Sequence, residues 1–110
     1  MPKKNPKNFV YIVNPEAGKL SVTKKKKVIK QIDSNKNPNI IFTKSSEESS
    51  SLARYYMNRK DIVIACGGDG MHNLIAQQAI ETSSIIGILP FGRGNDFARS
   101  LGINSMKKEF

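Results

Sequence analysis

The chain has 110 residues, of which 38% are hydrophobic and 25% charged, and its formal net charge at pH 7 is +9. This length and composition fit one globular domain, and no apolar stretch approaches the roughly 20 residues that a membrane-spanning helix needs. One cysteine and one histidine exclude an internal disulfide and any zinc site built from several Cys and His side chains.

The positive charge is concentrated in the first 44 residues, which contain eleven lysines and two acids. We expect residues 1–8 to form a basic tail without a signal peptide, so a cytoplasmic protein is predicted. Residues 24–27 are four consecutive lysines. Such a surface suits phosphates or anionic lipid, although a solvated helix face is the simpler interpretation of this run alone. No aromatic residues alternate with these lysines, so nucleic-acid binding is not expected.

Four apolar runs predict β-strands, at residues 9–13, 40–42, 62–66 and 85–89. Runs without polar alternation are typical of parallel sheets whose two faces are both covered. Stretches of helical length lie between them, and residues 9–110 therefore predict one doubly wound α/β domain of the Rossmann-like type.

Three helices are predicted between these strands. Residues 21–33 form the first, with only Val28, Ile29 and Ile32 available for burial. Ser45 and Glu48 have the spacing of a capping box at the start of the second. The apolar faces of the second and third helices are expected to consist of Leu52, Ala53, Tyr56 and Met57, and of Met71, Leu74, Ile75 and Ala79.

Glycine and helix-capping residues follow three of the predicted strands, in residues 14–19, 67–70 and 92–96. Ligands of open parallel sheets bind beyond the carboxyl ends of the strands, so we expect the three loops to face one crevice. Taken singly, the first loop is a weak signal because Asn-Pro often starts a turn, and Asn95 and Asp96 could simply cap a helix over residues 97–101.

The segment Gly67-Gly68-Asp69-Gly70 is the most informative of the three. Glycines let the backbone approach a bulky anion, with N–H groups and the start of the next helix directed at it, so a phosphate cradle is predicted. Asp69 beside phosphate requires a cation or a transferred proton between them, which indicates a Mg²⁺ contact or a general base. The alternative is a tight turn in which Asp69 is the helix N-cap.

Two further residues have chemistry to consider. Cys66 ends an apolar strand and is interpreted as a small buried hydrophobe rather than a nucleophile. His72 falls on the first turn of the third helix, where we expect a surface or cleft residue.

The stretches VNPEAGK, IVIACGGDGM and ILPFGRGNDFARSLGI resemble the nucleotide-binding half of the diacylglycerol kinase catalytic-domain family. The resemblance covers Phe9 to about Ile103. It implies the N-terminal domain fold shared with NAD kinases, and transfer of the ATP γ-phosphate to a lipid hydroxyl with Mg²⁺. Asp69 would be the catalytic residue. The nucleotide site would consist of Asn14, Gly18, Lys19, Gly67, Gly68, Asp69, Gly70, Gly92, Arg93, Gly94, Asn95 and Asp96.

The sequence departs from the family pattern at four positions. Ala17 replaces a serine, Met71 a threonine, Leu74 a glutamate and Arg93 a threonine. Arg93 could make a stronger phosphate contact than the hydroxyl that it replaces. No match to the family's second, β-rich domain is present. These departures leave two alternatives open, a non-catalytic nucleotide-binding or regulatory half-protein and, less favoured, an enzyme like NAD kinase. A lipid substrate at the membrane surface, anionic lipid, and self-association or a missing C-terminal domain are the expected partners.

Overall fold

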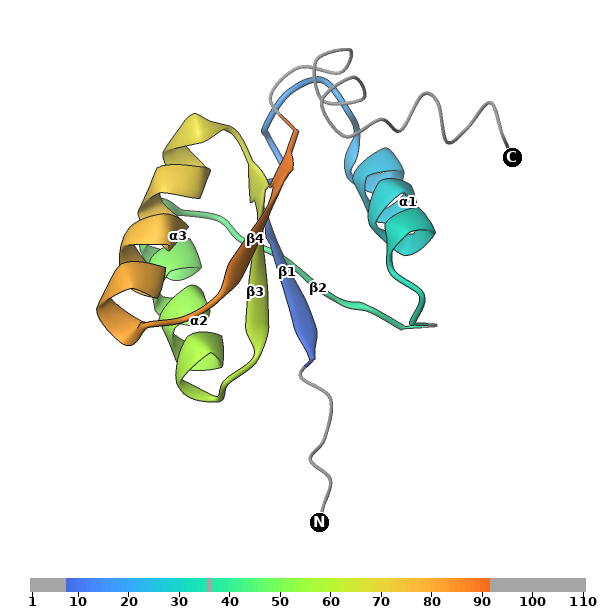
Figure 1. Cartoon of the computed structure of the whole chain (residues 1–110). Coiled ribbons are helices and arrows are strands. Elements are labelled where there is room, and N and C mark those ends of the chain that lie inside the picture. The colour runs from blue at the N-terminus through green and yellow to red at the C-terminus, as the bar shows by residue number, and fades with distance from the viewer. Residues whose placement is uncertain (1–7, 36, 92–110) are drawn as a thin grey trace.

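In the computed structural model, residues 8–35 and 37–91 are described. They form a parallel sheet of β1 (Phe9–Val13), β2 (Asn39–Phe42), β3 (Ile62–Gly67) and β4 (Ile86–Pro90), in the order β2-β1-β3-β4. The strands alternate along the chain with α1 (Val22–Ile32), α2 (Ser46–Asn58) and α3 (Asp69–Thr82). α1 covers one face of the sheet, and α2 and α3 cover the other (Figure 1).

Each face of the sheet has its own core. Val28 and Ile29 of α1 pack in a cluster with the strand residues Tyr11, Val13 and Cys66. The other cluster joins α2 and α3 to the opposite face and contains Val10, Ile12, Ala53, Met57, Val63, Ala65, Met71, Ile75 and Ala79. Alternate residues of β1 thus enter different cores, because successive strand side chains point to opposite faces. The predicted doubly wound α/β fold is confirmed.

The register aligns the carboxyl ends of all four strands. Val13 is level with Phe42 on one side and with Cys66 on the other, and Cys66 is level with Leu89. The segments that follow the strands therefore leave the sheet from one edge.

Local capping explains where two helices begin. The Ser21 hydroxyl accepts a hydrogen bond from Lys24 N (3.2 Å) at the start of α1. At α2, Ser45 Oγ accepts from Glu48 N (3.0 Å), and Glu48 Oε1 accepts from Lys44 N (2.7 Å), so the predicted capping box forms with its return bond one residue earlier than usual.

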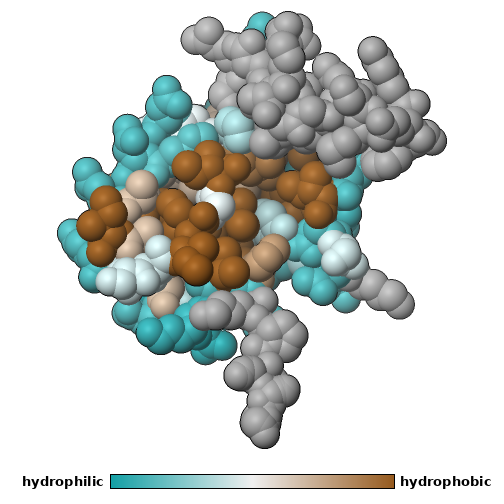
Figure 2. All heavy atoms as spheres, in the orientation of Figure 1, coloured by the Kyte–Doolittle hydropathy of each residue, from teal (hydrophilic) through white to brown (hydrophobic). Residues whose placement is uncertain are grey.

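The structure corrects three sequence-based expectations. Ile32 of α1, which was expected to be buried, is 40% exposed. Lys25 is fully buried, although the lysine run that contains it was interpreted as a solvated face. β4 begins at Ile86, and Ile85 is 70% exposed. The sheet is also incompletely covered, because β4 is an edge strand and Ile88 is 49% exposed; Figure 2 shows apolar residues gathered over this side of the molecule.

No helix within the described part of the chain is both long enough and apolar enough to cross a bilayer.

Candidate functional site

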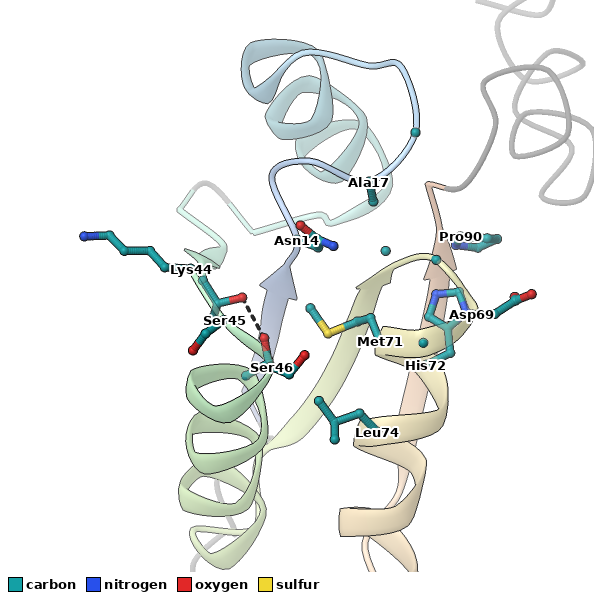
Figure 3. A pocket seen from close by; sticks show the side chains of 16 residues that line it. Asn14, Ala17, Lys44, Ser45, Ser46, Asp69, Met71, His72, Leu74 and Pro90 are labelled. Carbon is teal, nitrogen blue, oxygen red and sulfur yellow. Dashed lines mark hydrogen bonds between the residues drawn. The ribbon is translucent and has the colours of Figure 1, made fainter.

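A cleft of about 1040 Å³ lies at the edge of the sheet where the strands end (Figure 3). Four segments supply its walls: the β1–α1 loop, the β2–α2 corner, the β3–α3 turn with the first turns of α3, and the end of β4. The lining residues are Asn14, Ala17, Gly18, Thr43, Lys44, Ser45, Ser46, Ser49, Gly67, Gly68, Asp69, Gly70, Met71, His72, Leu74 and Pro90. Two of the three predicted loops thus meet in one cavity.

The β1–α1 loop is a compact turn built around Asn14. Its backbone N–H donates to Cys66 O (2.9 Å), and its side-chain Oδ1 accepts from Glu16 N (3.0 Å). Ala17 N donates to Asn14 O (3.2 Å). Gly18 has φ 65°, a left-handed conformation that glycine adopts without penalty. Lys19, also predicted for the site, is exposed and is not among the lining residues in the described part of the chain.

The three glycines of the β3–α3 turn differ in what surrounds them. A Cβ on Gly67 would lie 3.1 Å from Met71 Cβ and 3.4 Å from Asn14 Cβ, so this glycine allows close packing of the turn. Within the described residues, and apart from the neighbouring backbone of the turn and helix, no atom lies within 4 Å of the corresponding position on Gly68 or Gly70. Gly68 and Gly70 line the cleft, and their missing side chains leave open space at the start of a 14-residue helix.

Asp69 is the first residue of α3, and Gly68 is the N-cap. The alternative in which Asp69 caps the helix is therefore wrong. Asp69 is exposed, and Figure 3 shows its carboxylate directed away from Met71 and Asn14, at the rim of the cleft. Its negative charge in the first turn is favourable because helix N-termini carry partial positive charge.

Cys66 is buried in the core at the end of β3, whereas His72 is one of the residues that line the cleft. The His72 ring is partly buried, and its Nε2 is buried without a hydrogen-bond partner in the described region. Burial lowers the pKa of His72, while the carbonyls of Leu89 and Gly67 and the charge of Asp69 act in the opposite direction. Cys66 is fully buried, and burial raises the pKa of its thiol, as expected for a core residue.

The β2–α2 corner forms a wall that sequence reasoning missed. Thr43 and Ser49 are buried and share a hydrogen bond between their hydroxyls (2.6 Å), and Thr43 N donates to Val13 O (3.0 Å). Lys44, Ser45 and Ser46 complete the wall. A polar Thr-Lys-Ser-Ser stretch directly after a predicted strand was the available signal, but it contains no glycine.

Apolar side chains form part of the cleft as well. Ala17, Met71 and Leu74 line it, and Figure 3 shows the side chains of Met71 and Leu74 on the side of α3 that faces α2. These are three of the four positions at which the sequence departs from the pattern of the family it resembles.

The third predicted loop, comprising Gly92, Arg93, Gly94, Asn95 and Asp96, lies outside the described residues, as does the possible helix over residues 97–101. Pro90, two residues before this loop, lines the cleft. Within the described residues no group of three or more His, Cys, Asp or Glu side chains could hold a metal ion. Asp69 is the one carboxylate among the described lining residues.

Comparison with known proteins gives a consistent result. The family model described as the diacylglycerol kinase catalytic domain matches residues 8–110. Human diacylglycerol kinase iota is 30% identical over 100 residues, which are 86% of this chain and 9% of that protein. A probable YegS-like lipid kinase of Enterobacter sp. (strain 638) is 42% identical over 72 residues, or 58% of this chain and 24% of that protein.

A solved structure has the same fold. The crystal structure of a putative diacylglycerol kinase from Bacillus anthracis str. Sterne superposes with a TM-score of 0.70 and 26% sequence identity. It covers 91% of this chain, which corresponds to 36% of the solved chain. The present chain therefore spans only a minor part of the proteins that it matches.

Proposed function

Because the chain belongs to the diacylglycerol kinase catalytic-domain family, we propose that it is the nucleotide-binding part of an ATP-dependent lipid kinase. The observation that carries the proposal is the cleft itself. It brings the turn at Asn14 and the glycines before α3 together at the carboxyl edge of a parallel sheet, where nucleotides bind in folds of this class. The reaction proposed is transfer of the ATP γ-phosphate to a lipid hydroxyl.

The phosphates are assigned to the start of α3. Free backbone N–H groups and the helix dipole favour an anion there, and Gly68 and Gly70 leave the approach open. The carboxamide of Asn14 and the hydroxyl-bearing wall at Thr43, Ser45 and Ser46 offer hydrogen-bonding groups across the cleft. Positioning and charge neutralisation are the main demands of phosphoryl transfer on a protein.

Asp69 is assigned the acid–base or metal-holding role. A single exposed carboxylate at the rim suits Mg²⁺, which typically takes one or two protein carboxylates together with phosphate oxygens and water. When bound, the ion would neutralise phosphate charge. The absence of a multi-carboxylate cluster in the described region is compatible with this mode of binding. Lys19 and the loop over residues 92–96, with Arg93 as a phosphate contact, remain part of the proposed site on sequence grounds.

The test is calorimetric titration of Mg-ADP and Mg-ATP into the 110-residue chain and into Gly68→Val, whose side chain would enter the cleft. Gln77→Val, at an exposed position of the same helix and outside the cleft lining, is the matched control. We expect the control to bind nucleotide like the wild type and Gly68→Val to lose binding while staying folded by circular dichroism. Equal affinities of all three would refute the proposed phosphate site.

A non-catalytic nucleotide-binding module is the second candidate, favoured by the apolar side chains of Met71 and Leu74 in the cleft. It predicts nucleotide binding without phosphoryl transfer even when a C-terminal half from a relative is supplied. Phosphorylation of NAD instead of diacylglycerol would support the enzyme class resembling NAD kinase.

The lipid substrate requires contact with a membrane, for which we propose the outer face of α1. Lys24, Lys26, Lys27 and Lys30 are exposed there, and the first turn of α1 contains no acid. Clustered lysines attract anionic lipid surfaces, and each contributes about 1 kcal/mol near the surface. Peripheral association with a membrane follows from this proposal.

A further inference from the structure

Lys25 differs from the other lysines of α1 in being completely buried, with an exposed fraction of 0%. Its neighbours Lys24 and Lys26 are exposed. Lysine is almost never fully buried unless its charge has a partner. Burial lowers the pKa of Lys25, and the nearby charge of Glu16 opposes this effect.

The partners of Lys25 come from two segments that border the cleft. Its Nζ donates to Pro15 O (2.8 Å) in the β1–α1 loop, and it lies 5.7 Å from the ring centroid of Phe91, within the range of a cation–π contact. Phe91 directly follows β4, is buried, and donates its N–H to Gly67 O (2.9 Å). One side chain therefore contacts both the first loop and the exit of β4.

The hydrogen bond to Pro15 acts on a single peptide unit. Pro15 O and Glu16 N belong to the same rigid peptide plane. Lys25 holds the oxygen of this plane, and Asn14 Oδ1 holds its N–H at 3.0 Å. The orientation of that plane therefore fixes the side-chain carboxamide of Asn14, whose residue lines the cleft.

We propose that Lys25 is a positioning residue, which sets the Asn14 carboxamide for nucleotide binding through the Pro15–Glu16 peptide. The expected effect of Lys25 on nucleotide affinity rests on the proposed function. The expected effect of Lys25 on the β1–α1 loop does not depend on that function. Stability alone accounts poorly for Lys25, because a well-packed apolar side chain often replaces a buried charge without loss of stability.

The experiment compares Lys25→Met, which keeps an unbranched side chain and removes the charge, with Lys60→Met, the same charge change at an exposed position outside α1. Chemical unfolding, amide hydrogen exchange at Glu16 by NMR, and calorimetric titration with Mg-ADP are measured for both and for the wild type. Lys25→Arg, which keeps a charge and a donor, tests conservative rescue.

We expect Lys25→Met to fold with undiminished stability, to exchange the Glu16 amide about tenfold faster, and to bind Mg-ADP about tenfold more weakly, the magnitude of one good hydrogen bond. Lys60→Met should match the wild type, and Lys25→Arg should recover protection at Glu16. Unchanged Glu16 exchange in folded Lys25→Met would overturn the proposal. Loss of folding in that variant would also overturn it, because the ammonium would then be a requirement of the core.

The two proposals fail in different ways. If wild-type chain binds no nucleotide, the proposed function fails, and exchange at Glu16 still decides whether Lys25 holds the loop. If wild type binds Mg-ADP and both Met variants bind it equally well, the positioning role fails while the nucleotide site stands.

Discussion

Gly70 provides the sharpest test of whether the glycines serve a ligand or the fold. It is the second residue of α3 and lines the cleft. Beyond its own helix backbone, no atom of the described residues lies within 4 Å of the position that a Cβ would occupy. Alanine is about 1 kcal/mol more favourable than glycine within a helix. Because Gly70 lies near the helix start, we expect Gly70→Ala to raise the free energy of unfolding by about 0.5–1 kcal/mol.

The neighbouring Gly67 supplies the opposite case. Its Cβ would lie 3.1 Å from Met71 Cβ and 3.2 Å from Met71 Cγ, so in Gly67→Ala the Met71 side chain must move by a few tenths of an ångström. Overpacking of this kind costs about 1–3 kcal/mol. For a domain of this size, a change of 1 kcal/mol moves Tm by about 4–8 °C. Gly70→Ala should therefore melt a few degrees higher than the wild type and Gly67→Ala clearly lower.

Affinity should not follow stability. We expect Gly70→Ala to bind Mg-ADP at least about tenfold more weakly, a loss of about 1.4 kcal/mol, because its methyl group would occupy the space proposed for phosphate. Urea unfolding followed by circular dichroism and calorimetric titration measure the two quantities on the same samples. A Gly70→Ala protein that is more stable and binds nucleotide as well as the wild type would refute the cradle. A less stable one would mean that Gly70 serves the turn itself.

Three further predictions address Asp69, His72 and the α1 lysines. Asp69→Asn should lower phosphoryl transfer from labelled ATP to diacylglycerol by about 100-fold or more if the carboxylate acts on a proton. The same substitution should reduce the free energy of unfolding by at most about 1 kcal/mol, through the lost interaction with the helix dipole. Parallel losses of activity and stability would indicate a structural role. His72 has a lowered pKa in the fold because of burial, so the unfolded chain binds a proton first as pH falls through about 6.5. Stability measured by urea should therefore decline from pH 7.5 to pH 5, and more steeply than in His72→Leu; equal slopes would contradict the assignment. Lys26→Gln combined with Lys27→Gln should weaken cosedimentation with phosphatidylglycerol vesicles at low salt. Lys60 is an exposed lysine outside α1, and Lys60→Gln should leave cosedimentation unchanged. An equal loss in both proteins would refute a specific α1 surface.

Much of the fold could be predicted because continuous apolar runs and short polar connections indicate a covered parallel sheet. The predicted strand over residues 9–13 is β1, and residues 62–66 are all within β3. The start of β4 was misplaced because hydrophobicity does not distinguish an exposed edge from a core: Ile85 is apolar and 70% exposed. β4 is an edge strand of the described sheet, so within the described residues only one of its sides pairs with another strand.

The site was predictable where glycine marks it. The turn at Asn14 and the segment from Gly67 to Gly70 do meet in one cleft. The wall around Thr43 was missed because its residues serve as ordinary caps in many proteins. Lys25 was missed for a different reason: within four consecutive lysines only tertiary packing decides which side chain turns inward, and its long aliphatic stem can line a core while the ammonium finds an acceptor.

Backbone hydrogen bonds of the sheet extend to the first residue after three of the strands, and these bonds anchor the walls of the cleft. Asn14 N donates to Cys66 O (2.9 Å), Thr43 N to Val13 O (3.0 Å) and Phe91 N to Gly67 O (2.9 Å). The first residue beyond β1, β2 and β4 is therefore held to a neighbouring strand by a backbone hydrogen bond. From its second residue on, the β1–α1 loop makes no such hydrogen bond to the sheet in the described structure. Its geometry depends on the hydrogen bond that Asn14 Oδ1 accepts from Glu16 N and on the one that the buried ammonium of Lys25 donates to Pro15 O. Ligand affinity should accordingly respond more to substitutions that remove these hydrogen bonds than to conservative substitutions deeper in either core.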